Sequence, residues 1–505
     1  MTPSLRSSAR RGALSLLPMV LAAWLAAACG DDGRGREATV GAAVWWTPEE
    51  RTEWTTQRLE AGRLRRSGIA AQFLDAASTQ LDGTLIPADE LARAGRRSVQ
   101  LPVHLVVRSR LLASTPEEWG ETLATSLRGL RLDLGNRGDD LAGVLLWIED
   151  LELGEAQVAA LRRLRRELED DLALGVLAPD DVAASEVARQ TGKSFDYAVV
   201  ELYGQPPDQA DMPIRWELSR ALPRLRELVG LGVPLRAVVR CSGRLVAASN
   251  GTVLDLAVER AALRAAAGSV DGAFRFEGYD RQVFSFTFPS GFEPGESPSP
   301  RAGSALRISR PTAQHVGRAL RSLAELDAGE DAGGGDSVGS RVAPILAGFV
   351  DAQSAVGIGL EEALDVLVSG PRPPRLELEV EGGGSRLRVA LANRGGPTGV
   401  GQVRFNFVDV TVDGGVVAQV DPGEFPRYSL GGSNPSSRSE MRLGSARIAR
   451  LAVPLLEQDA ELRSGYISIR GSRPRIEVQA SFVDPLGNRV ESSPWIWPSP
   501  PEESR

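Results

Sequence analysis

Apolar runs that are rich in β-branched residues alternate with amphipathic helical stretches from Val40 to about Phe288. Eight runs are expected to be strands: Ala42–Trp46, Ile69–Leu74, Val99–Val107, Gly143–Glu149, Leu172–Leu177, Tyr197–Leu202, Leu235–Arg240 and Ala273–Glu277. Most of them are almost continuously apolar, which is typical of parallel strands buried on both faces. Eight such strands, alternating with helices over about 250 residues, predict an α/β fold, a (β/α)8 TIM-like barrel. An open doubly wound sheet is the alternative, because a strand count made from one sequence can err by about one or two.

Helical patterns with apolar residues spaced near 3.6 separate these runs. They cover Pro48–Arg66, Pro116–Leu130, Glu155–Glu169, Asp180–Gln190, Arg215–Val229 and Val253–Ala267. In the third pattern, Val158, Leu161, Leu164 and Leu168 form one apolar stripe. We therefore expect that helix to lay this stripe against the sheet.

The segment after the barrel pattern has a different composition. Gly291–Ser304 is rich in Pro, Gly and Ser and is expected to be a loop, and Thr312–Leu326 is expected to be a helix. Asp327–Ser340 is rich in Gly and Asp, which predicts disorder. A further helix is expected over about Val342–Leu367.

From Pro373 onward the apolar period changes from near 3.6 to two. Short alternating runs are separated by turn signals such as Gly382-Gly383-Gly384, Asp413-Gly414-Gly415 and Asp484-Pro485. This pattern predicts an all-β immunoglobulin-like sandwich.

The amino-terminal segment has the features of an export signal. Arg6, Arg10 and Arg11 precede an apolar run that ends in small residues at Cys29. We expect cleavage before Cys29 and lipidation of its thiol, which would tether an exported protein to a bacterial membrane, facing the periplasm or on the cell surface. A plain cleaved signal or an uncleaved anchor is the alternative.

These patterns divide the chain into six parts. They are a lipoprotein signal peptide (1–28), a lipidated tether (29–39), the TIM-like barrel (40–290), a loop-rich helical extension with a disordered segment (291–370), the β-sandwich (371–498) and a disordered tail (499–505).

Charge and cysteine content exclude several kinds of partner. The net charge of −8 argues against nucleic acid. With Cys29 lipidated, Cys241 has no disulfide partner. Two cysteines and two histidines, His104 and His315, do not make a convincing Cys/His zinc site, so we expect no metal and no cofactor.

The expected strand ends carry carboxylates and aromatic residues, and active groups of TIM barrels lie at the carboxyl ends of strands. Aromatic faces stack on pyranose rings, and two carboxylates can act across a glycosidic bond. We therefore expect Glu149 as the general acid, with Glu201 as its partner. The candidate substrate-binding residues are Trp45, Trp46, Asp150, Tyr203, Gln205, Arg240, Glu277 and Tyr279.

Structural roles are the alternatives for the same side chains. Glu149 could simply pair with Arg240, and Trp45 and Trp46 could be barrel core. His104 lies inside an apolar run and is expected to be a hydrogen-bonded core histidine.

Several stretches are similar to a known bacterial family. Val44-Trp45-Trp46, Leu101–Arg108, Gly143–Asp150 and Phe195–Gln205, together with the trailing sandwich, resemble the domain of unknown function 3142. That family looks like a glycosidase-type barrel with no established activity, so the resemblance implies this fold and leaves the chemistry open.

A more distant resemblance is to glycoside hydrolase family 18, whose fourth strand carries Asp-Gly-x-Asp-x-Asp-x-Glu. Aligned on Gly143, the terminal Glu of the motif falls on Glu149. The two inward Asp positions, which help to orient the substrate in that family, fall on Leu145 and Trp147, and the first Asp falls on Ala142. The chain thus matches the family at the acid and departs from it at the helper residues.

Two functions follow as expectations. One is a membrane-anchored lipoprotein with a glycoside-hydrolase-like barrel that acts on polysaccharide of the cell envelope or the environment, through paired carboxylates. The other is a non-catalytic lipoprotein that binds a glycan or an envelope protein.

Overall fold

A computed structural model describes most of the chain from residue 41 onward. The described residues are 41–47, 50–51, 61–80, 82–87, 101–109, 116–136, 139–148, 155–168, 172–178, 183–202, 218–249, 252–255, 275–278, 282–287, 305–328, 342–350, 354, 356–400, 406–431 and 442–498. The expected signal peptide, the tether with Cys29, the carboxyl-terminal tail and most of the expected disordered segment lie outside these residues.

Eight parallel strands of the described chain form a closed barrel. In ring order they are β1 (Ala42–Trp46), β2 (Ile69–Thr79), β4 (Val103–Ser109), β5 (Leu141–Ile148), β6 (Ala173–Ala178), β7 (Tyr197–Glu201), β8 (Leu235–Arg240) and β14 (Val342–Ala347). The ring closes at β1, where Val44 is in register with Gln72 of β2 on one side and with Leu346 of β14 on the other. The predicted TIM-like barrel is confirmed, and the open doubly wound sheet is excluded.

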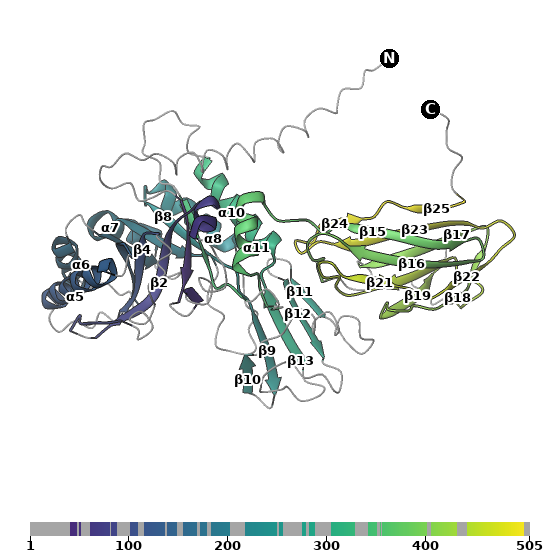
Figure 1. Ribbon diagram of the computed structural model, residues 1–505, viewed down its shortest axis with the longest axis horizontal. Helices are drawn as coiled ribbons and strands as arrows, with labels where there is room; N and C mark the ends of the chain where they lie inside the picture. Colours follow the sequence, from purple (N-terminus) through teal and green to yellow (C-terminus); the bar gives the residue numbers. More distant parts are fainter. Residues whose placement is uncertain are drawn as a thin grey trace, which may run out of the picture.

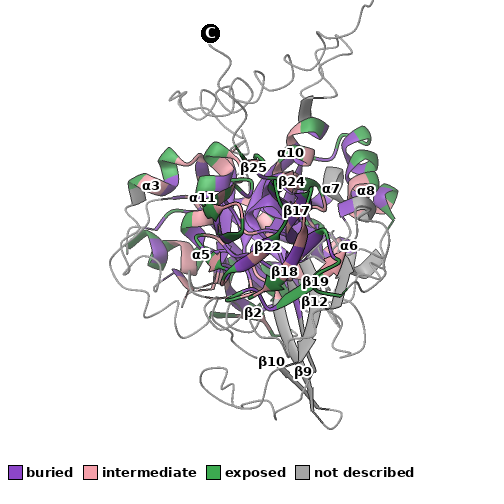
Figure 2. Cartoon of the chain, turned by 90° about the vertical axis from the view of Figure 1, so that its right-hand side faces the viewer, coloured by how far each residue is buried: buried purple, intermediate pink, exposed green. Residues whose placement is uncertain are grey.

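Helices surround the barrel and bury their apolar faces on its outer surface. They are α3 (Ala61–Arg66), α5 (Pro116–Asn136), α6 (Glu155–Leu168), α7 (Ala184–Ser194), α8 (Leu218–Gly230), α10 (Ala313–Ala328) and α11 (Leu360–Ser369). In α6 the predicted stripe from Val158 to Leu168 is buried, whereas Arg162 and Arg166 are exposed. Figure 2 shows the same division in the other helices, with buried inner faces and exposed outer faces.

The prediction that Ala273–Glu277 is the eighth barrel strand is wrong. That strand is β14, in a segment expected to be helical, and the barrel therefore extends beyond the expected limit of residue 290. Likewise, residues 291–370 are not a separate extension, because β14 and the helices α10 and α11 lie within them and pack with the barrel. All six residues of β14 are buried, and a short continuous apolar run has no period that separates strand from helix.

A five-stranded antiparallel sheet is inserted between β8 and α10. It consists of β9 (Arg244–Ser249), β10 (Thr252–Asp255), β11 (Arg275–Gly278), β12 (Gln282–Thr287) and β13 (Ala305–Arg310), in the order β10-β9-β13-β12-β11. The helix expected to begin at Val253 is wrong at its start, because Thr252–Asp255 is a strand. The sheet follows the carboxyl end of β8 directly and projects from the barrel (Figure 1). A short strand, β3 (Leu85–Pro87), pairs with the extended end of β2.

The carboxyl-terminal domain is the predicted β-sandwich. One sheet contains β15 (Leu376–Gly383), β16 (Arg386–Asn393), β18 (Val416–Val420), β21 (Glu461–Arg463) and β22 (Ile467–Arg470). The other contains β17 (Phe407–Asp413), β19 (Arg427–Gly431), β20 (Ile448–Ala452), β23 (Arg475–Val483), β24 (Arg489–Glu491) and β25 (Trp495–Trp497). Alternate residues such as Val389, Leu451 and Phe482 meet in one core between the sheets.

A buried ion pair joins the barrel part to the sandwich. Arg310, the last residue of β13, places its Nη2 atom 2.8 Å from Oε1 of Glu457, which follows β20. The two side chains are 4% and 5% exposed. A buried charge is costly unless it is paired, so each of these two side chains compensates the charge of the other.

Candidate functional site

Side chains inside the barrel form a cluster that is separate from the core beneath the helices. Its buried apolar members are Ala43, Trp45, Ala71, Phe73, Val106, Leu145, Leu177, Tyr197, Val199, Val238, Ile345 and Ala347. Strand residues of the opposite parity, such as Val44 and Leu146, join the outer core with the helices. This alternation determines which polar side chains can reach the barrel interior.

A polar group is buried among these residues near the amino ends of the strands. His104 Nδ1 lies 2.9 Å from the Tyr197 hydroxyl, and the His104 ring stacks on Phe73 at 4.8 Å between centroids. The Arg236 guanidinium lies 5.5 Å from the Phe73 ring centroid and 5.8 Å from that of Tyr197. The predicted role of His104 as a hydrogen-bonded core residue is confirmed.

Burial determines the ionisation of this group. Burial first, and the nearby Arg236 charge second, lower the pKa of His104 to about 3. Burial also raises the pKa of Tyr197 and lowers the pKa of Arg236. His104 is therefore neutral at pH 7, and the group forms part of the barrel core.

Two glycines provide the space for this polar group. A Cβ atom on Gly143 would lie 2.5 Å from Nδ1 of His104, and one on Gly175 would lie 2.3 Å from the Tyr197 ring. These two strand positions therefore admit no side chain while the rings stay where they are.

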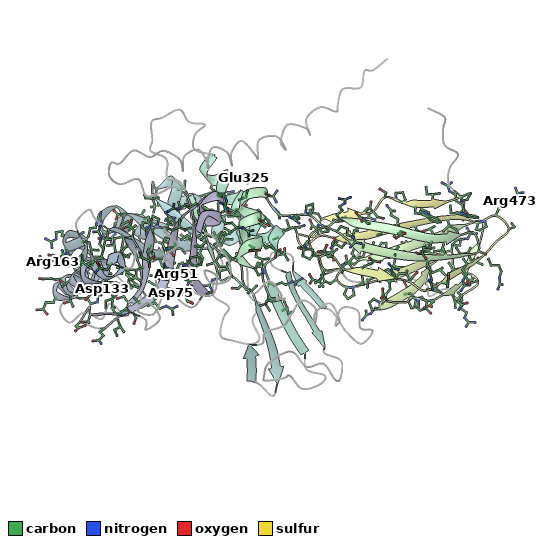
Figure 3. All side chains as sticks on the ribbon, in the orientation of Figure 1. Arg51, Asp75, Asp133, Arg163, Glu325 and Arg473 are labelled. Carbon is green, nitrogen blue, oxygen red and sulfur yellow. The ribbon has the colours of Figure 1, made fainter. Side chains whose placement is uncertain are left out.

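An aromatic and ionic group lies at the carboxyl ends of the strands. Arg108 of β4 binds Asp75 of β2 through two hydrogen bonds, Nη2–Oδ2 at 2.7 Å and Nε–Oδ1 at 3.3 Å. The Arg108 guanidinium also lies 4.5 Å from the centroid of Trp147, its neighbour on β5. Trp45 packs edge-on against Trp147 at 6.4 Å and stacks on Phe73 at 6.1 Å. Figure 3 labels Asp75 on the barrel part of the molecule.

A second ion pair lies on another side of the same end. Glu201 is the last residue of β7, and its Oε1 atom accepts a hydrogen bond of 2.7 Å from Nη2 of Arg240, the last residue of β8. The Nε atom of Arg240 is shielded from solvent and has no hydrogen-bond partner in the described part of the chain. We refer to Asp75, Arg108, Trp147, Glu201 and Arg240 together as the barrel-end group.

The structure brings together some of the predicted site residues. Glu201, Arg240 and Trp45 face the barrel interior at its carboxyl end. Trp46 faces the opposite way. It is 1% exposed in the core beneath the helices, and its indole N–H donates to Oε1 of Gln72, so Trp46 does not share the site with Trp45. Glu277 lies on β11 of the inserted sheet and not on a barrel strand.

The remaining predicted residues lie outside the described part of the chain. They are Glu149, Asp150, Tyr203, Gln205 and Tyr279. Of the two predicted catalytic residues, only Glu201 lies in the described part of the chain, and the role of Glu149 stays a prediction.

Three members of the barrel-end group were missing from the sequence-based site. Asp75, Arg108 and Trp147 lie on the inner faces of their strands, on the same parity as Phe73, His104 and Leu145. Extending the alternation of the expected strands to every barrel position would have identified all three.

The described residues contain neither a metal-binding cluster nor a helix that could span a membrane. No cluster of three or more His, Cys, Asp or Glu side chains there could hold a metal ion. None of the helices that the structure describes is both long enough and apolar enough to cross a membrane.

Comparison with known proteins gave matches among solved structures only. No protein-family model and no curated protein matches the sequence, so the resemblance to domain of unknown function 3142 stays a prediction. The spore cortex-lytic enzyme SleL of Bacillus cereus has a TM-score of 0.42 and 15% identity, over 67% of this chain and 76% of that one. A chitinase from Chromobacterium violaceum has a TM-score of 0.41 and 15% identity, over 65% and 98%. The family 18 chitinase ChiB of Flavobacterium johnsoniae has a TM-score of 0.39 and 12% identity, over 65% and 94%. Similarity at this level concerns the path of the backbone and says nothing about activity.

Proposed function

We propose that this chain is a membrane-anchored lipoprotein whose glycoside-hydrolase-like barrel binds a glycan at the carboxyl ends of its strands. The observation that carries the proposal is the half-buried Trp147 at this end, against which Trp45 packs edge-on. An indole face of this kind packs on the apolar face of a pyranose ring. The ion pairs on either side supply planar donors and acceptors for sugar hydroxyls.

The described side chains favour binding over cleavage. Leu145 and Trp147 occupy the inward positions of β5 where the family 18 motif has carboxylates. Both described carboxylates at the barrel end, Asp75 and Glu201, accept hydrogen bonds from guanidinium groups. Neither is arranged to give a proton to a leaving group, which glycoside hydrolysis requires.

Hydrolysis by Glu149 with Glu201 is the second candidate. It is favoured by the position of Glu201 as the inward-facing last residue of β7, at the end where barrel enzymes act. In sequence, Glu149 directly follows β5 and has the same parity as Leu145 and Trp147. A retaining mechanism would need the two carboxyl groups about 5–5.5 Å apart, and an inverting one about 6.5–9.5 Å apart.

The membrane anchor rests on the sequence before residue 41. Cys29 follows a basic and then apolar segment, as in lipoprotein precursors. Metabolic labelling with a fatty-acid probe tests it: we expect label in the full chain and none in Cys29→Ser. Equal labelling of both proteins would reject the anchor without affecting the proposal for the barrel.

A panel of chromogenic glycosides and cell-wall glycans tests the barrel. We expect at least one glycan to bind, and Trp147→Ala to weaken its binding about tenfold or more, equivalent to about 1.4 kcal/mol. Trp495→Ala is the matched control, because Trp495 is also half-buried but lies in the sandwich. Trp147→Phe keeps an aromatic face and should retain most of the affinity.

The outcomes separate the two candidates. If no glycan binds, or if Trp147→Ala and Trp495→Ala behave alike, glycan binding at the barrel end is wrong. If the wild type cleaves a glycan and Glu149→Gln abolishes the cleavage while binding is kept, the hydrolase is correct.

A further inference from the structure

The barrel-end group presents cations to an approaching ligand and holds its carboxylates underneath. We propose that the glycan bound there is acidic, with carboxylates on its pyranose units, and that Arg108 and Arg240 recognise these carboxylates. The inference rests on the proposed function and names the class of its ligand.

Exposure within the two ion pairs gives the first argument. Arg108 is 51% exposed and its partner Asp75 only 13%. Arg240 is 30% exposed and Glu201 only 17%. In both pairs the ligand therefore meets the guanidinium first, with the carboxylate orienting it from below. Guanidinium groups in such a position match the planar geometry of a carboxylate.

The position of Arg108 on Trp147 gives the second argument. Its guanidinium lies over the indole ring, so a pyranose can stack on that face only by displacing it. A neutral sugar would break this cation–π contact and would offer no charge in return. A carboxylated sugar can stack on the ring while its carboxylate holds the displaced guanidinium.

The hydrogen bonding of Arg240 gives the third argument. Only its Nη2 atom bonds to Glu201, and its Nε atom has no partner in the described part of the chain. A guanidinium has five N–H donors, so Arg240 keeps donors for a further acceptor. A buried donor without a partner is unfavourable, and a ligand oxygen that reorients the guanidinium would relieve this cost.

The two arginines lie on opposite sides of the barrel end. In the ring order, β5, β6 and β7 separate β4 from β8 on one side, and β2, β1 and β14 separate them on the other. An oligosaccharide that crosses this end can therefore meet Arg108 and Arg240 with different sugar units. A chain with repeated carboxylates fits this spacing better than a single charged sugar.

Isothermal titration of the full chain with defined oligosaccharides tests the inference. The acidic probes are tetragalacturonate, with ring carboxylates, and a muramic-acid tetrasaccharide, with lactyl carboxylates. The neutral probes are methyl-esterified tetragalacturonate and chitotetraose. We expect one acidic probe to bind at least tenfold more tightly than its neutral counterpart, and its affinity to fall as salt rises because the contact is ionic. The preferred acidic probe identifies the source of the carboxylate.

Arginine variants locate the contact. Arg108→Gln and Arg240→Gln should each weaken the acidic probe about tenfold or more and change neutral probes much less. Arg189→Gln on α7 is the matched control, because Arg189 is 49% exposed and, like Arg108, binds a carboxylate through Nε and Nη2. Arg108→Lys keeps the charge and serves if the Gln variant folds poorly, with an expected intermediate affinity.

The titration results separate a failure of this inference from a failure of the proposed function. If neutral and acidic probes bind equally, or if the Arg108 and Arg240 variants behave like Arg189→Gln, the inference is wrong and glycan binding still stands. If no probe binds and the wider glycan panel is also negative, the proposed function is wrong together with the inference.

Discussion

Acidification below about pH 6.5 should destabilise the barrel through His104, a buried residue of its interior. In the folded chain, burial first and the Arg236 charge second lower the pKa of His104 to about 3. In the unfolded chain the same ring titrates near its ordinary value, about 6.5. Between these two values the unfolded state binds a proton that the folded state does not.

The sign and size of the effect follow from this difference. Stability is fully present above about pH 6.5 and is lost as the pH falls toward 3, because the unfolded state gains protons first. Each pH unit in that window costs about 1.4 kcal/mol, so the loss between pH 8 and pH 5 is about 2 kcal/mol. Ordinary carboxylates titrate near pH 4, mostly below the measured interval from pH 8 to pH 5.

Urea unfolding measured by circular dichroism at 222 nm suits this test, because every helix that the structure describes packs around the barrel. The wild type should lose about 2 kcal/mol of unfolding free energy between pH 8 and pH 5. His104→Gln keeps a hydrogen-bonding partner for Tyr197 and has no charge to gain, so its loss should be smaller by that amount. Equal losses in the two proteins would show that His104 is not the titrating group and that its burial is less complete than we argue.

Two further predictions concern packing and charge. Glu457→Gln removes the carboxylate from the buried pair with Arg310 and should lower the free energy of unfolding by about 3–5 kcal/mol. Glu461→Gln, at an exposed pair, should leave it almost unchanged, and similar urea midpoints for the two variants would contradict the first value. Gly175→Ala places a methyl group within the van der Waals radius of the Tyr197 ring and should cost about 1–3 kcal/mol through overpacking, and a variant as stable as the wild type would show that the ring moves freely.

The first seven barrel strands could be predicted because each is an apolar run flanked by helical patterns. Ala42–Trp46 and Leu235–Arg240 match their predicted bounds. The eighth could not, since the inserted sheet contains β-rich runs of the same kind and β14 has no period of its own. Sequence patterns describe local conformation, whereas membership of the barrel depends on pairing across a long insertion.

The site was predicted at the level of strand ends and not of contacts. Glu201 and Arg240, expected at the ends of their strands, are the last residues of β7 and β8. Arg240 binds Glu201, and the alternative that paired it with Glu149 stays untested because Glu149 lies outside the described residues. Trp46 differs from Trp45 by one position, and in a strand one position reverses the face.

The long insertion has a consequence for how the chain can be made. β8 ends at Arg240 and β14 begins at Val342, so a ribosome must add the whole intervening segment before the cylinder can close. Until then β1 and β8 are open edge strands, whose unpaired backbone N–H and C=O groups pair readily with other polypeptides. A recombinant fragment that stops near residue 290 should therefore aggregate, whereas one that continues past β14 can close its barrel.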